Sequence, residues 1–134
     1  ADVASEVQRV AGRELPPEGL KILVAQAAHE TGDGQHAPNN NMFGHKATKG
    51  KASAAFETTE GEGAEAKRVM QNFRAYDSVA ESVDDHIDLI RRKYPDAWAA
   101  LERGDARAYA AALKDGGYYT GSETEYANGL ERRL

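Results

Sequence analysis

A helical pattern of apolar residues between Leu20 and Gly34 is the clearest structural signal in the sequence. Its apolar positions recur at helical spacing and define one inward face: Leu20, Leu23, Val24, Ala27 and Ala28. Pro16 and Pro17 precede the run, where proline is tolerated in a first helical turn. Gly32 stands where a chain commonly leaves a helix with positive φ. The pattern therefore predicts a helix that ends close to Gly32.

Five further stretches carry helical patterns. They cover residues 2–11, 78–94, 96–103, 105–113 and 123–134. Asp2, Ser78 and Asp105 stand where a side chain caps the start of a helix, and Ser78 and Glu81 have the spacing of a capping box. Pro95 ends the pattern that begins at Ser78. In that helix His86 lies at the edge of the apolar face, which predicts a hydrogen-bonded core or rim histidine.

The remaining segments predict a long loop and one β-hairpin. Residues 32–50 are rich in Gly, Asn and Lys and predict an irregular loop, of a length that is often functional. Residues 54–59 and 66–76 flank a stretch with two glycines and predict the two strands of a hairpin. The chain is thus expected to be a single α+β domain over residues 1–134, with a small β-lobe at about 52–76.

Composition and charge narrow the classes of function. The 134 residues suit one domain, with 40% hydrophobic and 29% charged residues, as in soluble globular proteins. The mean hydropathy of −0.70 argues against membrane insertion, and the net charge of −5 argues against nucleic-acid binding. The chain has no cysteine, which excludes disulfides and thiolate metal sites. The amino terminus shows no signal-peptide pattern.

Glu30 is the one acid on the apolar face of the helix that ends near Gly32. It lies seven residues after Leu23 and three after Ala27, two steps that return to nearly the same face. Burial would raise the pKa of its carboxyl and let it donate a proton near neutral pH. A glutamate in a last helical turn can equally bend outward to water, and position alone favours that ordinary interpretation.

Several chemical motifs are missing. His29-Glu30 begins like a zinc-protease helix, but Asp33 stands where the second histidine is required. The four histidines have no recurring ligand spacing, and no EF-hand, phosphate loop, dinucleotide fingerprint or nucleophile elbow is present. What remains is acid chemistry. Glycosidic bond cleavage uses a protonated carboxyl and, in most enzymes, a second carboxylate. Glu30 supplies the first, and Glu57, Glu60 or Glu62 on the hairpin could supply the second.

Four segments, in order, resemble the bacterial glucosaminidase family of peptidoglycan hydrolases (glycoside hydrolase family 73). They are residues 25–32 (AQAAHETG), 40–47 (NNMFGHKA), 73–78 (FRAYDS) and the carboxy-terminal pattern from 111–113 (AAL) through 117–120 (GYYT) to 126–127 (YA). The likeness is strongest to the carboxy-terminal wall-degrading domains of flagellar rod proteins. It extends from about residue 20 to the end of the chain.

The resemblance implies a fold and an activity. The implied fold is lysozyme-like, with a mainly helical lobe, a small β-hairpin lobe and a cleft between them for the glycan strand. The implied activity is that of an endo-β-N-acetylglucosaminidase, which cleaves after N-acetylglucosamine without a metal or cofactor. It also implies a location in the periplasm or extracellular cell wall, and wall opening during flagellar rod assembly with rod proteins as partners. A monomer is expected.

The resemblance also implies roles for individual residues. Glu30 matches the general acid of the family, Glu60 best matches the hairpin acid with Glu62 second, and Tyr126 matches a tyrosine near the scissile sugar. The remaining substrate-binding candidates lie in or beside the matching motifs: Asp33, Asn41, Phe43, Glu62, Tyr118 and Tyr119. Phe43 is equally compatible with simple packing of its loop against the helix end.

Asp33 departs from the family pattern, since many relatives have tryptophan at this position. An aspartate offers charge instead of a flat apolar surface to a sugar ring. If it is ionised near Glu30, its charge would raise the pKa of Glu30 further.

Two questions stay open at this level. The reaction could invert, with Glu60 activating water, or retain configuration through attack by the substrate's own N-acetyl oxygen, which we favour because the cleaved sugar should carry an acetamido group. The chain could also be a non-catalytic wall-binding module, or a muramidase or lytic transglycosylase that cuts the other glycosidic bond.

Overall fold

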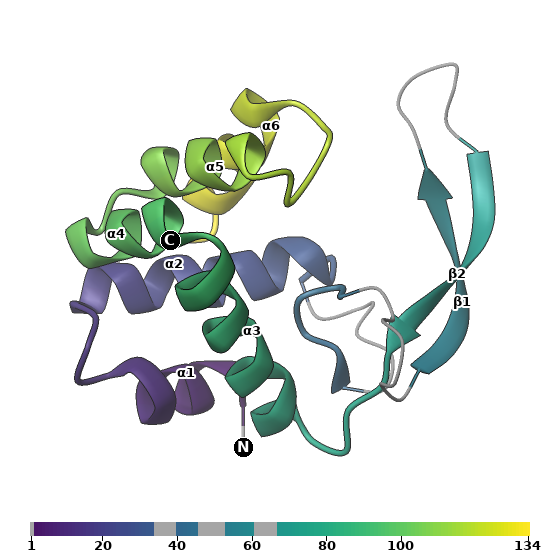
Figure 1. Ribbon diagram of the computed structural model, residues 1–134, viewed down its shortest axis with the longest axis horizontal. Coiled ribbons are helices and arrows are strands. Elements are labelled where there is room, and N and C mark those ends of the chain that lie inside the picture. Colours follow the sequence, from purple (N-terminus) through teal and green to yellow (C-terminus); the bar gives the residue numbers. More distant parts are fainter. Residues whose placement is uncertain (1, 34–39, 46–52, 61–66) are drawn as a thin grey trace.

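The computed structural model describes residues 2–33, 40–45, 53–60 and 67–134, and its described part contains six helices and one two-stranded sheet (Figure 1). In chain order these are α1 (Val3–Ala11), α2 (Pro17–Glu30), β1 (Ser53–Glu60), β2 (Lys67–Arg74), α3 (Val79–Lys93), α4 (Pro95–Arg103), α5 (Ala106–Asp115) and α6 (Glu123–Glu131). None of these helices combines the length and the apolar character that crossing a membrane requires.

Helix α2 is the central element of the helical body. It runs across the middle of the molecule, with α1 and α3 on one side and α4, α5 and α6 on the other (Figure 1). It packs against α1, α4 and α6. The approach to α4 is close, because a Cβ on Gly19 would overlap the backbone carbonyl oxygen of Leu101. A helix with neighbours on both sides must bury more than one stripe of residues.

The buried face of α2 differs from the one that the sequence predicted. Leu23 and Ala27 are buried as expected, but Leu20, Val24 and Ala28 are only partly buried. The fully buried positions include Ile22 and the polar Gln26. The prediction of a single inward stripe was wrong because it assumed a helix covered on one side only.

The three predicted helix caps are confirmed. The side chains of Asp2, Ser78 and Asp105 accept hydrogen bonds from the backbone N–H groups of Ser5, Glu81 and Ala108, at 2.7, 3.2 and 3.0 Å. Ser122 caps α6 in the same way, because its hydroxyl accepts a hydrogen bond from the backbone N–H of Glu125 at 3.2 Å. Gly32 has a φ of 58°, as predicted for the residue at which the chain leaves α2.

The core of the helical body joins residues from all six helices. Its largest fully buried apolar side chains are Tyr109, Phe43, Ile22, Leu23, Ile87, Ile90, Leu101, Leu113 and Leu130. Phe43 is the one member of this group that comes from outside the helices, and it ties the 40–45 segment to the core. The carboxy-terminal end of α2 is thereby held against both that segment and α6.

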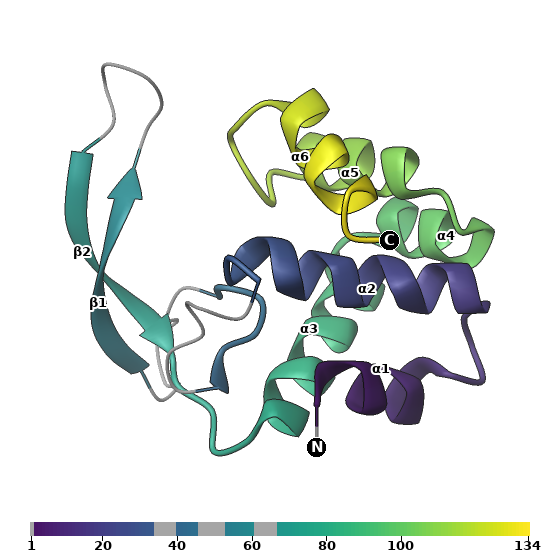
Figure 2. The same ribbon diagram turned by 180° about the vertical axis from the view of Figure 1, so that it is seen from behind.

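The hairpin pairs only with itself to any substantial extent. Strands β1 and β2 are antiparallel, from Ser53 opposite Arg74 to Glu60 opposite Lys67. Strand β2 lies within the predicted segment 66–76, and β1 extends one residue beyond each end of the predicted segment 54–59. Both views show the ribbon projecting from the helical body (Figures 1 and 2). In the described part of the chain, every substantial contact between elements other than that of β1 with β2 joins two helices.

The predicted fold class is therefore corrected. The sequence analysis expected an α+β domain whose helical lobe and β-lobe enclose a cleft. The packed body is instead all helical, and in the described part of the chain the hairpin is a two-stranded ribbon whose one substantial contact is between its own strands. A cavity in the described part of the chain is lined by residues from the end of α3, α4 and α5. The correction has a simple cause: local alternation predicts a strand, but only tertiary packing decides whether two strands form a lobe.

Candidate active site

Glu30 is the last residue of α2, and its carboxyl is held by a residue from the other end of the chain. The Tyr126 hydroxyl, on α6, donates a hydrogen bond to Glu30 Oε1 at 2.6 Å. The glutamate is partly buried. A Cβ on Gly44 would lie 3.8 Å from Glu30 Oε2, so the 40–45 segment passes beside the second oxygen. The carboxyl thus lies between α6 and that segment.

The surroundings of Glu30 change the pKa of its carboxyl. Burial raises the pKa of the carboxyl to about 7, and the hydrogen bond from Tyr126 opposes part of this rise by stabilising the carboxylate. The sequence analysis predicted the direction of this change. At neutral pH the carboxyl is therefore divided between its protonated and ionised forms, which suits a group that must both give and take a proton.

Tyrosines surround the carboxyl. Tyr109 and Tyr126 are buried, and the hydroxyl of Tyr118 is a buried polar atom without a hydrogen-bond partner in the described part of the chain. Burial and the charge of Glu30 raise the pKa of all three phenols well above the ordinary value. All three phenols stay protonated, and Tyr109 and Tyr126 donate hydrogen bonds to Gln26 and Glu30. Tyr119 stacks on Tyr126 with ring centroids 4.1 Å apart and fixes that ring from one side.

A buried hydrogen-bond chain continues from Tyr126 into the core. Gln26 Nε2 lies 3.0 Å from the Tyr126 hydroxyl, and Gln26 Oε1 lies 2.7 Å from His86 Nε2. His86 Nδ1 lies 3.0 Å from His45 Nε2. The hydrogen-bond chain therefore runs from His45 through His86, Gln26 and Tyr126 to Glu30. His86 is fully buried and hydrogen-bonded, as the sequence analysis predicted.

Gln26 is the residue of this site that the sequence analysis missed. It lies on α2 one turn before Glu30 and is fully buried. Its oxygen also accepts a hydrogen bond from Tyr109 at 2.6 Å. A glutamine inside an apolar helical pattern was the available signal, because a buried amide must find partners. Those partners could not be identified from the helix alone.

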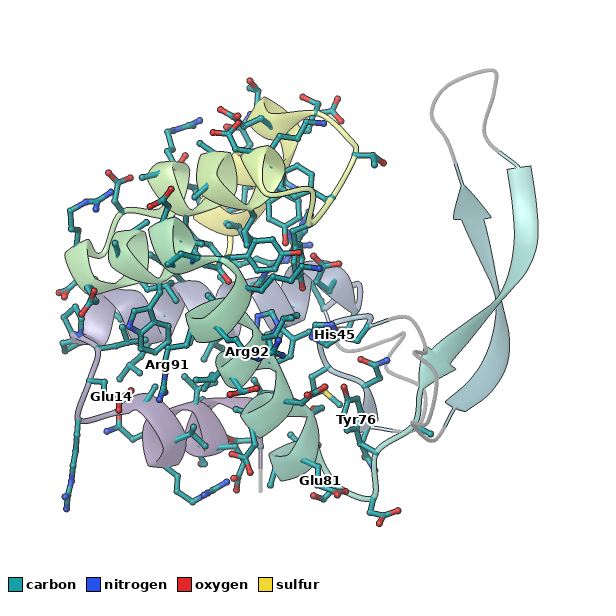
Figure 3. All side chains as sticks on the ribbon, viewed as in Figure 1. Glu14, His45, Tyr76, Glu81, Arg91 and Arg92 are labelled. Carbon is teal, nitrogen blue, oxygen red and sulfur yellow. The ribbon has the colours of Figure 1, made fainter. Side chains whose placement is uncertain are left out.

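Asn41 and Phe43 shape the site from within the 40–45 segment. The Asn41 side chain bonds the backbone of His45 twice, from Nδ2 to the carbonyl at 2.8 Å and from the N–H to Oδ1 at 3.0 Å. Phe43 stacks on His86 with ring centroids 3.7 Å apart. His45 lies where this segment meets α3 (Figure 3). Asn41 and Phe43 are each only 2% exposed, so their visible role is to position the segment.

Asp33 does not act on Glu30 as the sequence analysis suggested. Its carboxylate forms an ion pair with Arg133, with Oδ1 at 2.9 Å from Nε and Oδ2 at 3.2 Å from Nη2. The hydrogen bond from Arg133 lowers the pKa of Asp33, and Asp33 is not among the causes of the raised pKa of Glu30. Its charge is largely neutralised by the arginine. The pair joins the turn after α2 to the end of α6.

The structure describes the backbone of two of the three hairpin acids, Glu57 and Glu60, which lie on β1. Glu60 is the last residue of β1, opposite Lys67, and Glu62 lies outside the described residues. Among residues 2–33, 40–45, 53–60 and 67–134, no group of three or more His, Asp or Glu side chains is placed to hold a metal ion. The described part of the site therefore consists of Glu30, the Tyr126 that donates to it, and the buried hydrogen-bond chain behind them.

Comparison with known proteins decides the family. The family model described as "Glucosaminidase: Mannosyl-glycoprotein endo-beta-N-acetylglucosaminidase" matches residues 6–134. The chain belongs to the glucosaminidase family. Peptidoglycan hydrolase FlgJ of Escherichia coli K12 is 37% identical over 122 residues, which are 84% of this chain and 38% of FlgJ. This glucosaminidase domain thus spans well under half the length of that relative.

Solved structures agree with this assignment. A peptidoglycan hydrolase mutant from Sphingomonas sp. A1 aligns with a TM-score of 0.74 at 32% identity, over 97% of this chain and 84% of that one. A truncated glycoside hydrolase domain of Salmonella typhimurium FlgJ aligns with a TM-score of 0.70 at 31% identity, over 98% and 89%. The glucosaminidase domain described here therefore shares its fold with glycoside hydrolases.

Proposed function

We propose that this glucosaminidase domain is a peptidoglycan hydrolase that cleaves the glycan strand after N-acetylglucosamine, from within the strand, with Glu30 as general acid. The observation that carries the proposal is the Glu30 carboxyl: its pKa is raised to about 7 and Tyr126 donates to it at 2.6 Å. A general acid works best when its pKa lies near the operating pH. Membership of the family and the likeness to FlgJ support peptidoglycan as the substrate.

In the proposed reaction the protonated Glu30 gives its proton to the glycosidic oxygen as the bond to the anomeric carbon breaks. The substrate's acetamido oxygen attacks that carbon and forms a cyclic cationic intermediate. Water then opens the ring, and the ionised Glu30 takes the proton that the water loses. The Tyr126 hydroxyl stabilises Glu30 in its ionised form between the two steps.

Substrate assistance is favoured over a second protein carboxylate by the surroundings of Glu30. No other carboxylate among the described side chains contributes to its raised pKa. Glu60 lies on a hairpin that packs little against the helices. NMR of the first-formed product tests this: the proposal expects the β-anomer, and the α-anomer would instead indicate that Glu60 activates water with inversion.

Digestion of purified peptidoglycan, followed by mass spectrometry of the products, tests the activity. We expect new reducing N-acetylglucosamine ends and large first fragments, and Glu30→Gln should lower the rate about 10²–10⁴-fold. Reducing N-acetylmuramic acid would instead indicate a muramidase, an anhydro sugar a lytic transglycosylase, and intact strands a wall-binding module. Wild-type rates in Glu30→Gln would overturn the assignment of the acid.

The hairpin acids are assigned a supporting role. We expect Glu60→Ala to lower the rate strongly and Glu62→Ala to lower it less, because Glu60 matches the family position better. Both variants replace a glutamate by alanine and so remove the same charge, which makes each a control for the other. Equal losses would contradict a specific role for Glu60.

The cellular setting extends the same proposal. We also propose a monomeric domain that acts in the periplasm or extracellular wall, beside flagellar rod proteins that need a gap in the wall; the likeness to the peptidoglycan hydrolase FlgJ supports the action on the wall. Light scattering after gel filtration tests the monomer. Co-purification with rod components from flagellated cells tests the partners, and an equal yield from cells without a rod would contradict them.

A further inference from the structure

The buried hydrogen-bond chain behind Glu30 can be assigned a direction. An ionised Glu30 only accepts, so the single Tyr126 proton points to Glu30 Oε1. The Tyr126 oxygen must then accept from Gln26, which places the amide nitrogen toward Tyr126 and the amide oxygen toward His86 and Tyr109. With Glu30 ionised, these hydrogen bonds assign one direction to each donor between Gln26 and Glu30.

The two histidines of the hydrogen-bond chain also have assigned protons. His86 must carry its proton on Nε2 to donate to the Gln26 oxygen at 2.7 Å. Burial and the neighbouring His45 lower the pKa of His86 well below its ordinary value, so the ring is neutral and Nδ1 accepts. His45 then donates from Nε2 at 3.0 Å. The 40–45 segment thus sets the orientation of Gln26 through two rings.

We propose that Gln26 is a positioning residue for the general acid, whose amide, locked by His86 and Tyr109, holds the Tyr126 hydroxyl on Glu30. The inference rests on the proposed function of Glu30 and deepens it. Donors in series polarise one another, so a donor to the Tyr126 oxygen strengthens the bond that Tyr126 makes to the carboxylate. Without Gln26, the phenol loses its second anchor.

The test compares Gln26→Met with Leu23→Met. Both residues are fully buried on α2, and only Gln26 belongs to the hydrogen-bond chain. The assay measures kcat, KM and pH dependence on a glycan strand, and ¹³C NMR measures the titration of Glu30. We expect Gln26→Met to lower kcat about tenfold with little change in KM, the effect of one hydrogen bond. Leu23→Met should leave the Glu30 titration unchanged.

The pH readout has a defined sign. Tyr126 lowers the pKa of Glu30, so weakening its hydrogen bond in Gln26→Met should raise that pKa and move the alkaline limb of activity to higher pH. The other titratable groups near Glu30, Tyr109 and Tyr118, stay protonated over this range because their own pKa values are raised. Asp33 and Arg133 compensate each other at the helix end.

A double-mutant cycle separates positioning from general damage. In a Tyr126→Phe background, Gln26→Met should shift neither the Glu30 titration nor the pH profile further, because its route to Glu30 is gone. An equal shift in both backgrounds, or a Gln26→Met that behaves like Leu23→Met, would overturn the inference. If Gln26→Met does not fold, Tyr109→Phe tests the inference instead, because it removes one of the two donors to Gln26 Oε1. This variant should raise the pKa of Glu30 by a smaller amount.

The two proposals can fail separately. If wild type releases no reducing ends from glycan, the proposed function fails, and the NMR titration of Glu30 still measures the coupling to Gln26. If wild type cleaves glycan and Gln26→Met leaves both kcat and the titration unchanged, only the positioning role fails.

Discussion

The end of α2 and the β-hairpin carry the two sets of acids that the sequence singled out, and they are built differently. Glu30 sits where α2, α6 and the 40–45 segment meet, with Tyr126, Gln26 and His86 behind it. The hairpin is held by its own ladder and projects from the helical body. The packing of the helices therefore sets the pKa of Glu30, whereas the surroundings of a hairpin acid depend on the position of the hairpin relative to the helices.

The largest stability effect should come from the pH dependence of Glu30. Its folded pKa of about 7 exceeds its ordinary value of 4.5, so the folded state binds the proton more tightly than the unfolded state does. The contribution of Glu30 to the free energy of unfolding is thus fully present below pH 4.5. It decreases as the pH rises to about 7, by on the order of 3 kcal/mol. Urea unfolding at pH 4.5 and 8 should show this difference in wild type and lose it in Glu30→Gln. The exposed control Glu102→Gln should keep it.

Gly19→Ala tests how tightly the helical body is packed. The new Cβ would overlap the Leu101 carbonyl oxygen, a backbone atom that cannot rotate away. We expect a loss of about 1–3 kcal/mol in the free energy of unfolding, measured with urea. Lys21→Ala, at an exposed position on the same helix, should change it by less than about 0.5 kcal/mol. Similar losses in both variants would contradict the close α2–α4 contact.

Thr58→Pro tests the independence of the hairpin. Thr58 lies inside the ladder opposite Val69, and proline removes a ladder donor. Hydrogen exchange should become fast in β1 and β2 and stay slow in α2 and α5, with the thermal midpoint lowered by less than about 2 °C. A midpoint that falls as far as in Gly19→Ala would show that the hairpin supports the core, and the comparison of the two regions would fail.

The smallest effect concerns the ion pair at the end of α2. Arg133 helps lower the pKa of His29 and Asp33 helps raise it, although burial is the main cause of its lowered value. Arg133→Gln should therefore raise the pKa of His29, and Asp33→Asn should lower it, as NMR of the ring measures. Both changes should leave global stability nearly unchanged, because exposed ion pairs contribute little. Shifts of the same sign in both variants would contradict the charge assignment.

Much of the local structure could be predicted from the sequence because local rules govern it. The caps at Asp2, Ser78 and Asp105 depend on residues three positions away, and the turn at Gly32 depends on one backbone angle. Helical spacing placed Glu30 in line with Leu23 and Ala27, but position alone favoured a side chain bent outward to water. The fold class did not follow, because alternation along two strands says nothing about what the strands pack against.

By itself the sequence determined the caps at which three helices begin, that an acid stands in the last turn of α2, and which family the motifs match. Only the tertiary structure decided what surrounds that acid. Tyr126 lies 96 positions after Glu30, and His86 lies 60 positions after Gln26. Contacts at such separations depend on how whole helices pack, and no local pattern encodes them. The raised pKa of Glu30 was foreseeable in direction, but the residues that hold its carboxyl were not.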